Sequence, residues 1–487
     1  MSYGLSKSRI LSHRQCPKRL WLQVYRPELA DETMSQSVMA TGGSVGAIAR
    51  QLHPDGVLID VQDLRQALHQ TRLALKSRPR RPLFEGTFEH DGVLVRADLL
   101  IPQARGWRMV EVKSSTSVKD DQVEDAAIQS WVLRQAGEPL RAEAIAHVDR
   151  DFVGPGDGNY EGLLTAENVG KTIAERLPEV PQWIQAARST LDAGREPEIE
   201  PGPQCNDPFA CPFQSHCIPE PQGYPVDILS YGAKVAAQLR AEGYADLRDV
   251  PSGRLTHHRH LRIWEASCTG KAYVAPELRD ILQRLPYPRY YIDFETINPA
   301  IPLWAGTRPY QQIPFQWSCH AQHADASLRH TAFLADGPND PRRAFATSLL
   351  QVVGTSGPVL VWSQSFEQGR LVELADAFPN LAPALHKLIG RLVDLLPLAR
   401  EHYYHPDMMG SWSIKAVLPT IAPELAYDNL EVADGGMAQE AFTNILLQQM
   451  PPEQRESTRQ ALLVYCERDT LAMVKIVQFL CDKAPKK

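Results

Sequence analysis

Apolar and polar residues alternate between positions 84 and 113, and this period of two predicts β-strands in the first part of the chain. The runs are FEGTFEH, VLVRADLLI and WRMVEVK, and the Asp91-Gly92 pair between the first two is typical of a tight hairpin. Helical spacing is predicted in three segments, residues 1–25, 121–136 and 167–193. The first region is therefore expected to mix strands and helices.

A second such pattern begins at Tyr290 with the run YYIDFE. The β-type runs FQWSCH, HTAFL and PVLVW follow, and residues 453–480 predict a long closing helix. A Pro- and Cys-rich stretch over 197–225 and several short helical segments separate the two regions. We therefore expect an α/β multidomain protein with three parts, namely residues 1–222, a helical connector over 223–285, and residues 286–487.

The composition is that of an ordinary globular protein, 43% hydrophobic and 22% charged. No uncharged apolar run reaches the roughly 18 residues of a membrane span, and the N-terminal segment lacks the features of a secretion signal. We expect a cytoplasmic protein without membrane contact, whose cysteines are thiols or metal ligands. The net charge of −7 does not indicate nucleic-acid binding. Two basic clusters are either solvated faces or phosphate-binding patches, namely Lys7, Arg9, Arg14, Lys18 and Arg19, and Arg72, Lys76, Arg78, Arg80 and Arg81.

Three residues that suit metal-dependent chemistry are grouped in the run RADLLIPQARGWRMVEVKSS. Strand alternation puts Glu111 and Lys113 on one face, opposite Val112. Asp98, at the end of the neighbouring strand, is expected beside Glu111. Two carboxylates this close repel one another unless a divalent cation such as Mg²⁺ or Mn²⁺ lies between them. Lys113 could then stabilise charge that develops on a phosphate. The alternative is an ordinary charged surface strand.

The order of these residues resembles the RecB-like branch of the PD-(D/E)XK nuclease superfamily. The resemblance implies a restriction-endonuclease-like fold in which Asp98 and Glu111 hold the metal and Lys113 is catalytic. It also implies a site role for Gln129, in the DAAIQSWVL segment that follows.

The sequence departs from the family pattern at two points. The tyrosine that usually follows the glutamine is replaced around Trp131 or Leu133. A histidine is common in an earlier helix of the family, but Gly46 or Ala49 stands in the expected register, and His53 is nearby but out of register.

Three cysteines are evenly spaced in QCNDPFACPFQSHC, and a fourth, Cys16, lies in RQCPKRLW. The spacing of Cys205, Cys211 and Cys217 is wider than the two to four residues typical of zinc ribbons. The arrangement resembles the iron–sulfur nucleases of the RecB branch, which implies that these four thiolates bind a structural [4Fe–4S] cluster. Zinc and unmetallated thiols are the alternatives. The other four cysteines are expected in the core, namely Cys268, Cys319, Cys466 and Cys481.

A second acidic pattern begins in YYIDFET, where Asp293 and Glu295 share one face of a strand. Later, Tyr465 and Asp469 are four residues apart and share a helix face. This order resembles the DnaQ-like, or DEDD, 3′→5′ exonucleases, which implies an RNase H-like fold and a two-metal site.

The resemblance implies that Glu367, in PVLVWSQSFEQGRL, occupies the place of a further metal-binding acid, usually aspartate. It also implies that Tyr465 orients the attacking water and that Asp394 has a supporting position. Tyr310 and Phe315 could stack on bases, although core packing is favoured for Phe315.

Together these features predict a Mg²⁺- or Mn²⁺-dependent nuclease, expected to be a DNA exonuclease in repair, processing or defence. The pairing of the two domains resembles a bacterial family with this arrangement. The expected partner is nucleic acid, DNA rather than RNA. A helicase or other repair or defence protein could supply a motor, because no Walker-type phosphate loop is present. The alternatives are a catalytically decayed nucleic-acid-binding protein and a cysteine-cluster regulator that senses redox state or zinc.

Overall fold

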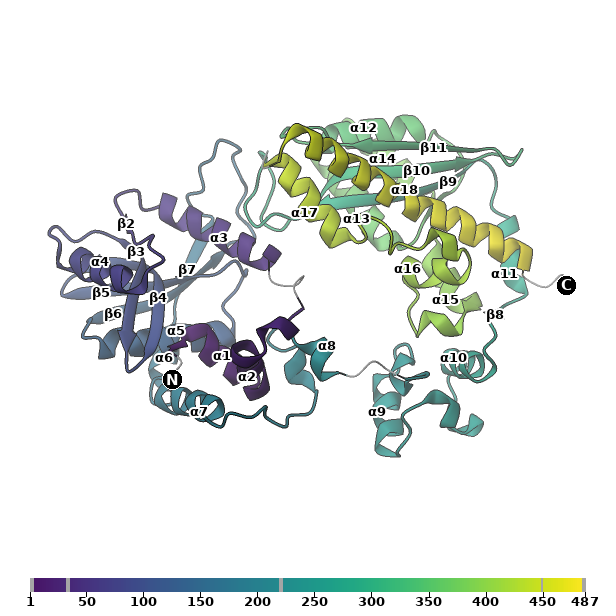
Figure 1. Ribbon diagram of the computed structural model, residues 1–487. Helices are drawn as coiled ribbons and strands as arrows, with labels where there is room; N and C mark the ends of the chain where they lie inside the picture. Colours follow the sequence, from purple (N-terminus) through teal and green to yellow (C-terminus); the bar gives the residue numbers. More distant parts are fainter. Residues whose placement is uncertain (1–3, 32–35, 219–221, 448–449, 484–487) are drawn as a thin grey trace. The chain divides into compact units, whose positions relative to one another are not determined.

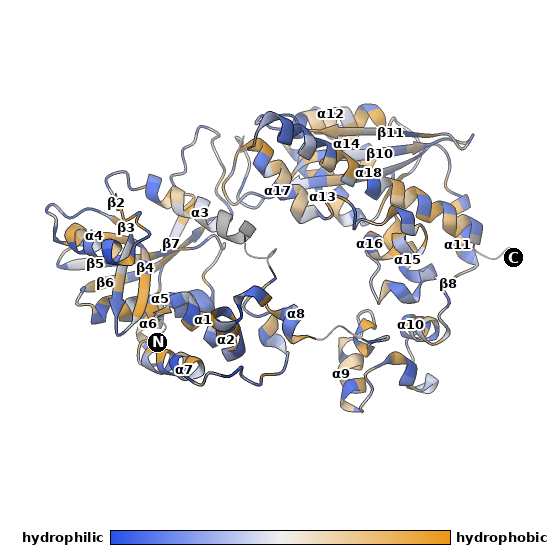
Figure 2. Cartoon of the chain, viewed as in Figure 1, coloured by the Kyte–Doolittle hydropathy of each residue, from blue (hydrophilic) through white to orange (hydrophobic). Residues whose placement is uncertain are grey.

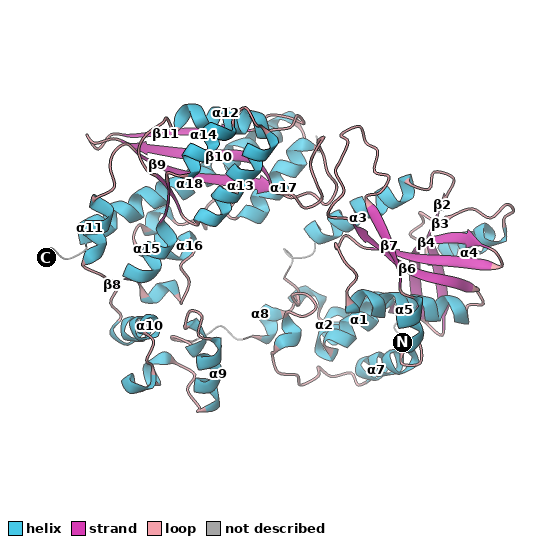
Figure 3. Cartoon of the chain, turned by 180° about the vertical axis from the view of Figure 1, so that it is seen from behind, coloured by secondary structure: helices cyan, strands magenta, loops and turns pink. Residues whose placement is uncertain are grey.

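The computed structural model describes residues 4–31, 36–218, 222–447 and 450–483. The chain divides into two compact units. Unit 1 consists of Met1–Glu220 with Pro299–Gln311, and unit 2 consists of Pro221–Asn298 with Gln312–Lys487. Both units combine sheets with helices (Figures 1 and 3), so the predicted α/β multidomain class is confirmed. The segment Pro299–Gln311 belongs to unit 1 although it lies in the second half of the sequence.

Unit 1 is built on a seven-stranded mixed sheet with the order β2-β3-β4-β5-β6-β7, and β1 pairs with β4 off this path. The strands are β1 Leu5–Ser6, β2 Val57–Leu58, β3 Leu83–His90, β4 Val93–Gln103, β5 Gly106–Val112, β6 Leu140–Val148 and β7 Leu164–Asn168. The hairpin between β3 and β4 is confirmed, and Asp91 and Gly92 both have positive φ, as a tight turn requires. Strand β6 was missed because its alanine-rich run has low β propensity.

The helices of unit 1 are α1 Lys7–Gln15, α2 Pro17–Tyr25, α3 Gln36–Gln51, α4 Leu64–Lys76, α5 Asp120–Gln135, α6 Gly170–Arg176, α7 Val180–Asp192 and α8 Gln214–Cys217. The predicted N-terminal helix is two helices, because Cys16 has extended backbone and Pro17 begins α2. The predicted helix over 167–193 is wrong at its start, where strand β7 ends, and it is divided between α6 and α7. Helix α5 packs on β3, β4 and β6, and α1 packs on α5.

Unit 2 contains a five-stranded sheet with the order β11-β10-β9-β12-β13. Its strands are β9 Arg289–Ile297, β10 Ile313–Gln322, β11 Leu328–Leu334, β12 Val359–Val361 and β13 Leu392–Asp394. The first three strands are antiparallel, and β9, β12 and β13 are parallel. A two-stranded sheet pairs β8 Tyr273–Val274 with β14 Tyr403–Tyr404. The strands predicted from YYIDFE, FQWSCH, HTAFL and PVLVW are confirmed.

The helices of unit 2 are α9 Ala233–Ala241, α10 His258–Thr269, α11 Glu277–Gln283, α12 Arg342–Val352, α13 Gln364–Ala377, α14 Ala382–Ile389, α15 Leu395–His402, α16 Ile414–Val417, α17 Gly435–Leu446 and α18 Pro452–Lys483. Ile292 and Phe294 of β9 pack against α12, α13 and α14, whereas α17 and α18 cover the other face of the strand. The helices carry both apolar and polar residues (Figure 2). Among the described residues, no helix has both the length and the apolar character of a membrane span. Phe315 is buried and stacks on Phe442, as favoured from the sequence.

Candidate functional site

Three predicted residues of unit 1 meet where β4 and β5 pair. Asp98 lies in the middle of β4 and not at its end as predicted, because the strand continues beyond it. Its Oδ2 accepts a hydrogen bond from the Val112 amide of β5 at 2.8 Å. Glu111 is only 1% exposed, and its side chain is directed toward α5, where it contacts Gln129. The alternation of strand positions therefore brings both carboxylates beneath one helix.

A network of two carboxylates and two lysines forms around Glu111. Its Oε1 accepts from Lys113 Nζ at 2.7 Å and from Lys7 Nζ at 2.9 Å, and its Oε2 accepts from Gln129 Nε2 at 2.6 Å. Asp125 of α5 contacts the same groups, at 2.6 Å from Lys113, 3.2 Å from Lys7 and 3.0 Å from Gln129. Each buried carboxylate thus has two cationic partners and one amide donor.

The pKa values of the two predicted metal ligands in this first centre, Asp98 and Glu111, are shifted in opposite directions. Burial opposes ionisation of Glu111, but the charges of Lys7 and Lys113 outweigh it and lower the pKa below its usual range. Burial raises the pKa of Asp98 to about 8, and the negative charge of Glu111 adds to this effect. Without an added ion, Asp98 is therefore largely protonated at neutral pH while Glu111 is ionised. A divalent cation beside Asp98 would favour loss of that proton.

Two members of the network, Lys7 and Asp125, were not predicted. Lys7 was assigned to a basic cluster interpreted as a solvated face or a phosphate patch, but its side chain is 22% exposed and is paired with buried acids. Asp125 precedes Gln129 by four residues and therefore shares its helix face, which is a signal that the sequence contained. The position of Lys7 depends on the pairing of β1 with β4, which no local pattern indicates.

Three side chains that stand where the sequence departs from the family pattern pack against other side chains, namely Trp131, Leu133 and His53. Trp131 packs edge-on against His90, with ring centroids 5.4 Å apart, and Leu133 is fully buried in the core. His53 lies beside Phe84, with ring centroids 6.5 Å apart.

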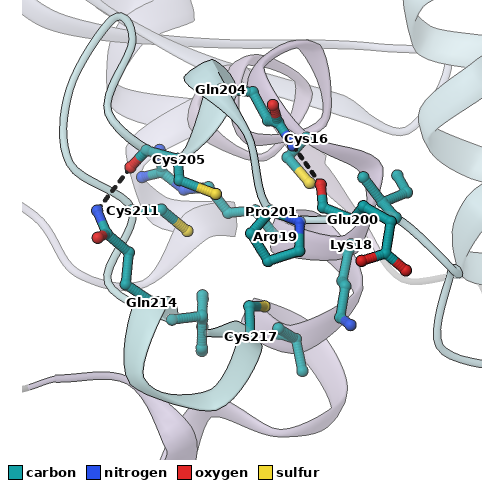
Figure 4. Close-up of a pocket in the computed structure, with 13 residues that line it drawn as sticks. Cys16, Lys18, Arg19, Glu200, Pro201, Gln204, Cys205, Cys211, Gln214 and Cys217 are labelled. Atoms are coloured by element: carbon teal, nitrogen blue, oxygen red, sulfur yellow. Dashed lines mark hydrogen bonds between the residues drawn. The ribbon is translucent and has the colours of Figure 1, made fainter. Parts of the chain in front are cut away.

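The four predicted cysteines line a single small cavity (Figure 4). Cys16 separates α1 from α2, Cys217 ends α8, and the Cys211 amide donates to the Cys205 carbonyl at 2.8 Å. All four are free thiols whose sulfur atoms face the common space. The cavity thus brings together Cys16 and Cys205, which are almost 200 residues apart in the sequence.

The separation of these sulfur atoms bears on which metal they suit. Among the described residues, the only group of three or more His, Cys, Asp or Glu ligand atoms within 4.8 Å of one another is Asp293, Glu295 and Cys466. No three cysteine sulfurs of the cavity are therefore that close. A tetrahedral zinc ion with Zn–S bonds of about 2.3 Å would hold them about 3.8 Å apart. Within the described residues, no three of these sulfurs therefore have the spacing of a tetrahedral zinc site.

In unit 2, four predicted acids converge in a second centre. Asp293 and Glu295 occupy alternate positions of β9, Glu367 lies in the first turn of α13, and Asp469 lies in α18. Glu295, Glu367 and Asp469 are 8%, 4% and 5% exposed. The Cys466 thiol lies 3.7 Å from Asp293 Oδ2. Cys466 is buried, as predicted, but it lies at this centre. Cys319 is also buried, whereas the core prediction is wrong for Cys268, which is exposed.

Burial raises the pKa of every acid in this second centre, and repulsion from neighbouring acids of the centre adds to it at Asp293 and Glu295. The pKa of Glu295 is raised to about 8 by burial and then by Asp469, and that of Glu367 is raised to about 8 by burial. Burial raises the pKa of Asp469 to about 6, and that of Asp293 lies well above its usual value. Glu367 Oε2 is also buried and has no hydrogen-bond partner among the described residues. Oxygen donors that repel one another, one of them unsatisfied, are the set that a hard divalent cation would stabilise.

Two aromatic hydroxyls and one lysine border these acids. Tyr427 donates to Asp469 Oδ1 at 2.5 Å, and its ring lies 6.2 Å from that of Tyr465. The Lys415 ammonium lies 5.2 Å from the Tyr465 ring and 5.4 Å from the Tyr427 ring. Its charge lowers the pKa of Glu295 and Asp469, opposing the effect of burial. Tyr427 and Lys415 were not predicted as site residues, because the runs LAYDNL and GSWSIKAVLP carry no recognisable chemical pattern.

Asp394 supports the second centre from its edge. Its Oδ1 accepts from the Leu396 amide at 3.0 Å and caps α15, while its Oδ2 accepts from the Gln364 amide at 3.1 Å. Gln364 begins the helix that carries Glu367. Asp394 thus fixes the start of two helices beside the acids.

Comparison with known proteins adds relatives without an assigned activity. Residues 290–413 match a family described as a domain of unknown function (DUF2779). An uncharacterized protein of Mycoplasma pneumoniae, a homolog of MG366, is 29% identical over 245 residues, which cover 46% of this chain and 36% of the relative. The uncharacterized MG366 of Mycoplasma genitalium is 24% identical over 232 residues, 44% of this chain and 35% of that protein. The chain spans about a third of the length of these curated relatives.

Replacing Lys7 by alanine should destabilise the first centre. Glu111 and Asp125 would share one lysine in a buried site, and loss of one partner of a buried ion pair costs about 3 kcal/mol. We expect faster amide hydrogen exchange in β4 and β5, measured by mass spectrometry. Arg9→Ala, which removes a half-buried cation of the same helix that bonds the Gly4 carbonyl, is the control. Equal exchange in the two variants would contradict the role of Lys7.

The second centre should bind divalent ions more tightly as pH rises. Its acids have a higher pKa in the folded than in the unfolded chain, so the metal-free protein loses their contribution to stability between about pH 4 and pH 8. An ion that binds the ionised carboxylates offsets this loss. The rise in melting temperature on adding Mg²⁺ should be larger at about pH 8 than at about pH 6. The double variant Glu295→Gln, Glu367→Gln should show little rise, and a pH-independent rise in the unmodified protein would oppose the assignment.

Proposed function

We propose that this protein is a metal-dependent nuclease with two acidic centres, and that DNA is the substrate it cleaves. The observation that carries the proposal is the second centre, where four carboxylates, three buried and one half-buried, converge with raised pKa values. Burying several like charges is costly and is rarely found unless a bound ion repays it. Phosphodiester hydrolysis is the reaction that such oxygen-ligated ions most directly serve.

The topology of unit 2 supports a DnaQ-like exonuclease assignment on an RNase H-like fold. Its central strand β9 carries Asp293 and Glu295, its antiparallel neighbours lie on one side, and its parallel neighbours lie on the other. Helix α18 packs on that strand, and its Asp469 is close enough to raise the pKa of Asp293, in agreement with the motif order of the resemblance. Glu367 instead of aspartate is the departure, and its extra methylene group still leaves its carboxylate buried at the centre.

In this centre Asp293, Glu295, Glu367 and Asp469 would hold two divalent ions. When bound, these ions would activate water and stabilise the leaving 3′ oxygen. The chain itself orients the donors, since the Tyr427 hydroxyl fixes one oxygen of Asp469 and leaves the other available. Tyr465 would hold the attacking water, and burial of its hydroxyl keeps it protonated as a donor by raising its pKa far above neutral pH.

The kinds of residue that meet in the first centre support the PD-(D/E)XK assignment. Asp98 and Glu111 would hold a metal ion, and Gln129 keeps one oxygen of Glu111 in position. Lys113 would stabilise negative charge on the phosphate as the reaction proceeds. Its contacts with Glu111 and Asp125 hold the ammonium at the site before substrate binds.

The cysteine cavity supports a structural [4Fe–4S] cluster held by Cys16, Cys205, Cys211 and Cys217. Such a cluster would tie the junction of α1 and α2 to the C-terminal loop of unit 1, and its binding energy would add to folding. Burial raises the pKa of Cys211 and Cys217, and the charges of Arg19 and Lys18, which line the same cavity, partly oppose this effect.

Cleavage of end-labelled DNA and RNA with Mg²⁺ or Mn²⁺ tests the nuclease activity. If both centres work, Lys113→Ala and Asp293→Ala should each leave partial activity, and the double variant should lose at least about a hundredfold. Lys171→Ala and Asp376→Asn remove exposed charges from the same two units and should cleave as the unmodified protein does. Binding without any cleavage would instead favour the catalytically decayed protein.

Anaerobic purification tests the cysteine cavity. We expect iron and acid-labile sulfide with a broad visible charge-transfer band, and loss of both from the Cys211→Ser variant. Cys268→Ser, which alters an exposed cysteine outside the cavity, should retain them. Stoichiometric zinc without iron would contradict the cluster. Reversible loss of DNA binding on oxidation, with no cleavage, would favour the sensing regulator.

A further inference from the structure

A loop from the second half of the sequence forms part of unit 1. The segment Pro299–Gln311 lies between β9 and β10 in the chain, yet it packs with unit 1. The Gly154 amide donates to the Thr307 carbonyl at 2.9 Å, and the Gly154 carbonyl accepts from the Gly306 amide at 2.9 Å. Ala300 joins an apolar cluster with Val45, Val148 and other residues of this unit. The segment is therefore anchored by both backbone and core contacts.

The loop that receives this segment has glycines where a side chain would not fit. A Cβ atom at Gly154 would lie 2.7 Å from Pro302, and one at Gly156 would lie 2.8 Å from Ala305. Gly156 also has a φ of +82°, which disfavours other residues. The sequence of unit 1 thus accommodates the segment closely.

The segment ends with a tyrosine in an unfavourable backbone conformation. Tyr310 has a φ of +59°, uncommon for a bulky residue, and its amide donates to the Pro299 carbonyl at 2.9 Å. Its hydroxyl donates to the carbonyl of Ser114, the residue after Lys113. A strained conformation kept in place by several contacts is typical of a functional position.

Tyr310 lines an open groove beside the first centre, with about 1090 Å³ of unfilled space. Lys113 lines the groove, together with the hydroxyl side chains from Ser114 to Ser117. Lys119 and Arg150 are exposed there and form no ion pair with the described residues, while Asp121 is the acid of the lining. Phe209 is 47% exposed in the same groove. The groove therefore joins two aromatic rings, two unpaired cations and the lysine of the first centre.

We propose that this groove binds single-stranded nucleic acid and guides it to the first centre. Tyr310 and Phe209 stack on unpaired bases, and Lys119 and Arg150 bind phosphates. The loop from the second half of the sequence is thus a substrate-binding element of the first centre. The second part of this inference, delivery of the strand to Lys113, rests on the proposed nuclease function. The first part, strand binding by the groove, can be measured by itself.

Fluorescence anisotropy of a labelled single-stranded oligonucleotide, with Ca²⁺ in place of Mg²⁺, measures strand binding by the full chain. Tyr310→Ala should weaken binding about tenfold, whereas Tyr310→Phe, which keeps the ring, should stay within about twofold. Lys119→Ala with Arg150→Ala should reduce the slope of log affinity against log salt by about 1.4, since two phosphate contacts are lost. In an Asp293→Asn background, Tyr310→Ala should slow the remaining cleavage of single strands.

Tyr160→Phe is the matched control, because it removes a hydroxyl bonded to Pro302 of the same segment without altering the groove. It should bind as the unmodified protein does. Unchanged binding by Tyr310→Ala would overturn the proposal, as would equal weakening by Tyr310→Phe or tighter binding of duplex than of single strands. Strand binding that depends on Tyr310 in a protein without cleavage would support the groove and overturn the nuclease function alone.

Discussion

The cost of burying carboxylates close together governs both candidate centres. In the first, Lys7 and Lys113 compensate Glu111 and Asp125, so the folded chain supplies its own counterions. In the second, Lys415 is the cation that most strongly opposes the raised pKa values of Glu295 and Asp469. The two centres are therefore electrostatically different. The first is held together by its ion pairs, whereas the second requires protons or bound cations to be stable.

Helix α1 connects the first centre with the cysteine cavity. Lys7 is its first residue, and Cys16 follows its last. Nine residues of helix therefore set the distance between the lysine that reaches Glu111 and the thiol that faces the cavity. Cys16 also directly precedes α2. The cysteine cavity and the network around Glu111 therefore both constrain helix α1. A group bound by the cysteines would restrict the motion of Lys7 through this helix.

Unit 1 also depends on residues far away in the sequence. Its groove takes Tyr310 from the loop between two strands of the other unit's sheet, and Phe209 from the cysteine-rich loop. Gly154 and Gly156 allow the loop to approach because they lack side chains. The first centre and its surroundings therefore involve both halves of the chain, which a division into consecutive domains does not reveal.

The sequence by itself determined the features that depend on neighbouring residues. Strand alternation paired Asp293 with Glu295 and Glu111 with Lys113, the Asp91-Gly92 turn marked a hairpin, and most strands and helices followed from periodicity. The tertiary structure alone decided what depends on distant contacts. It brought Lys7 onto Glu111, Tyr427 onto Asp469, and Tyr310 into unit 1. Local patterns report which face a side chain occupies, whereas its partners across that face are set by how the chain packs.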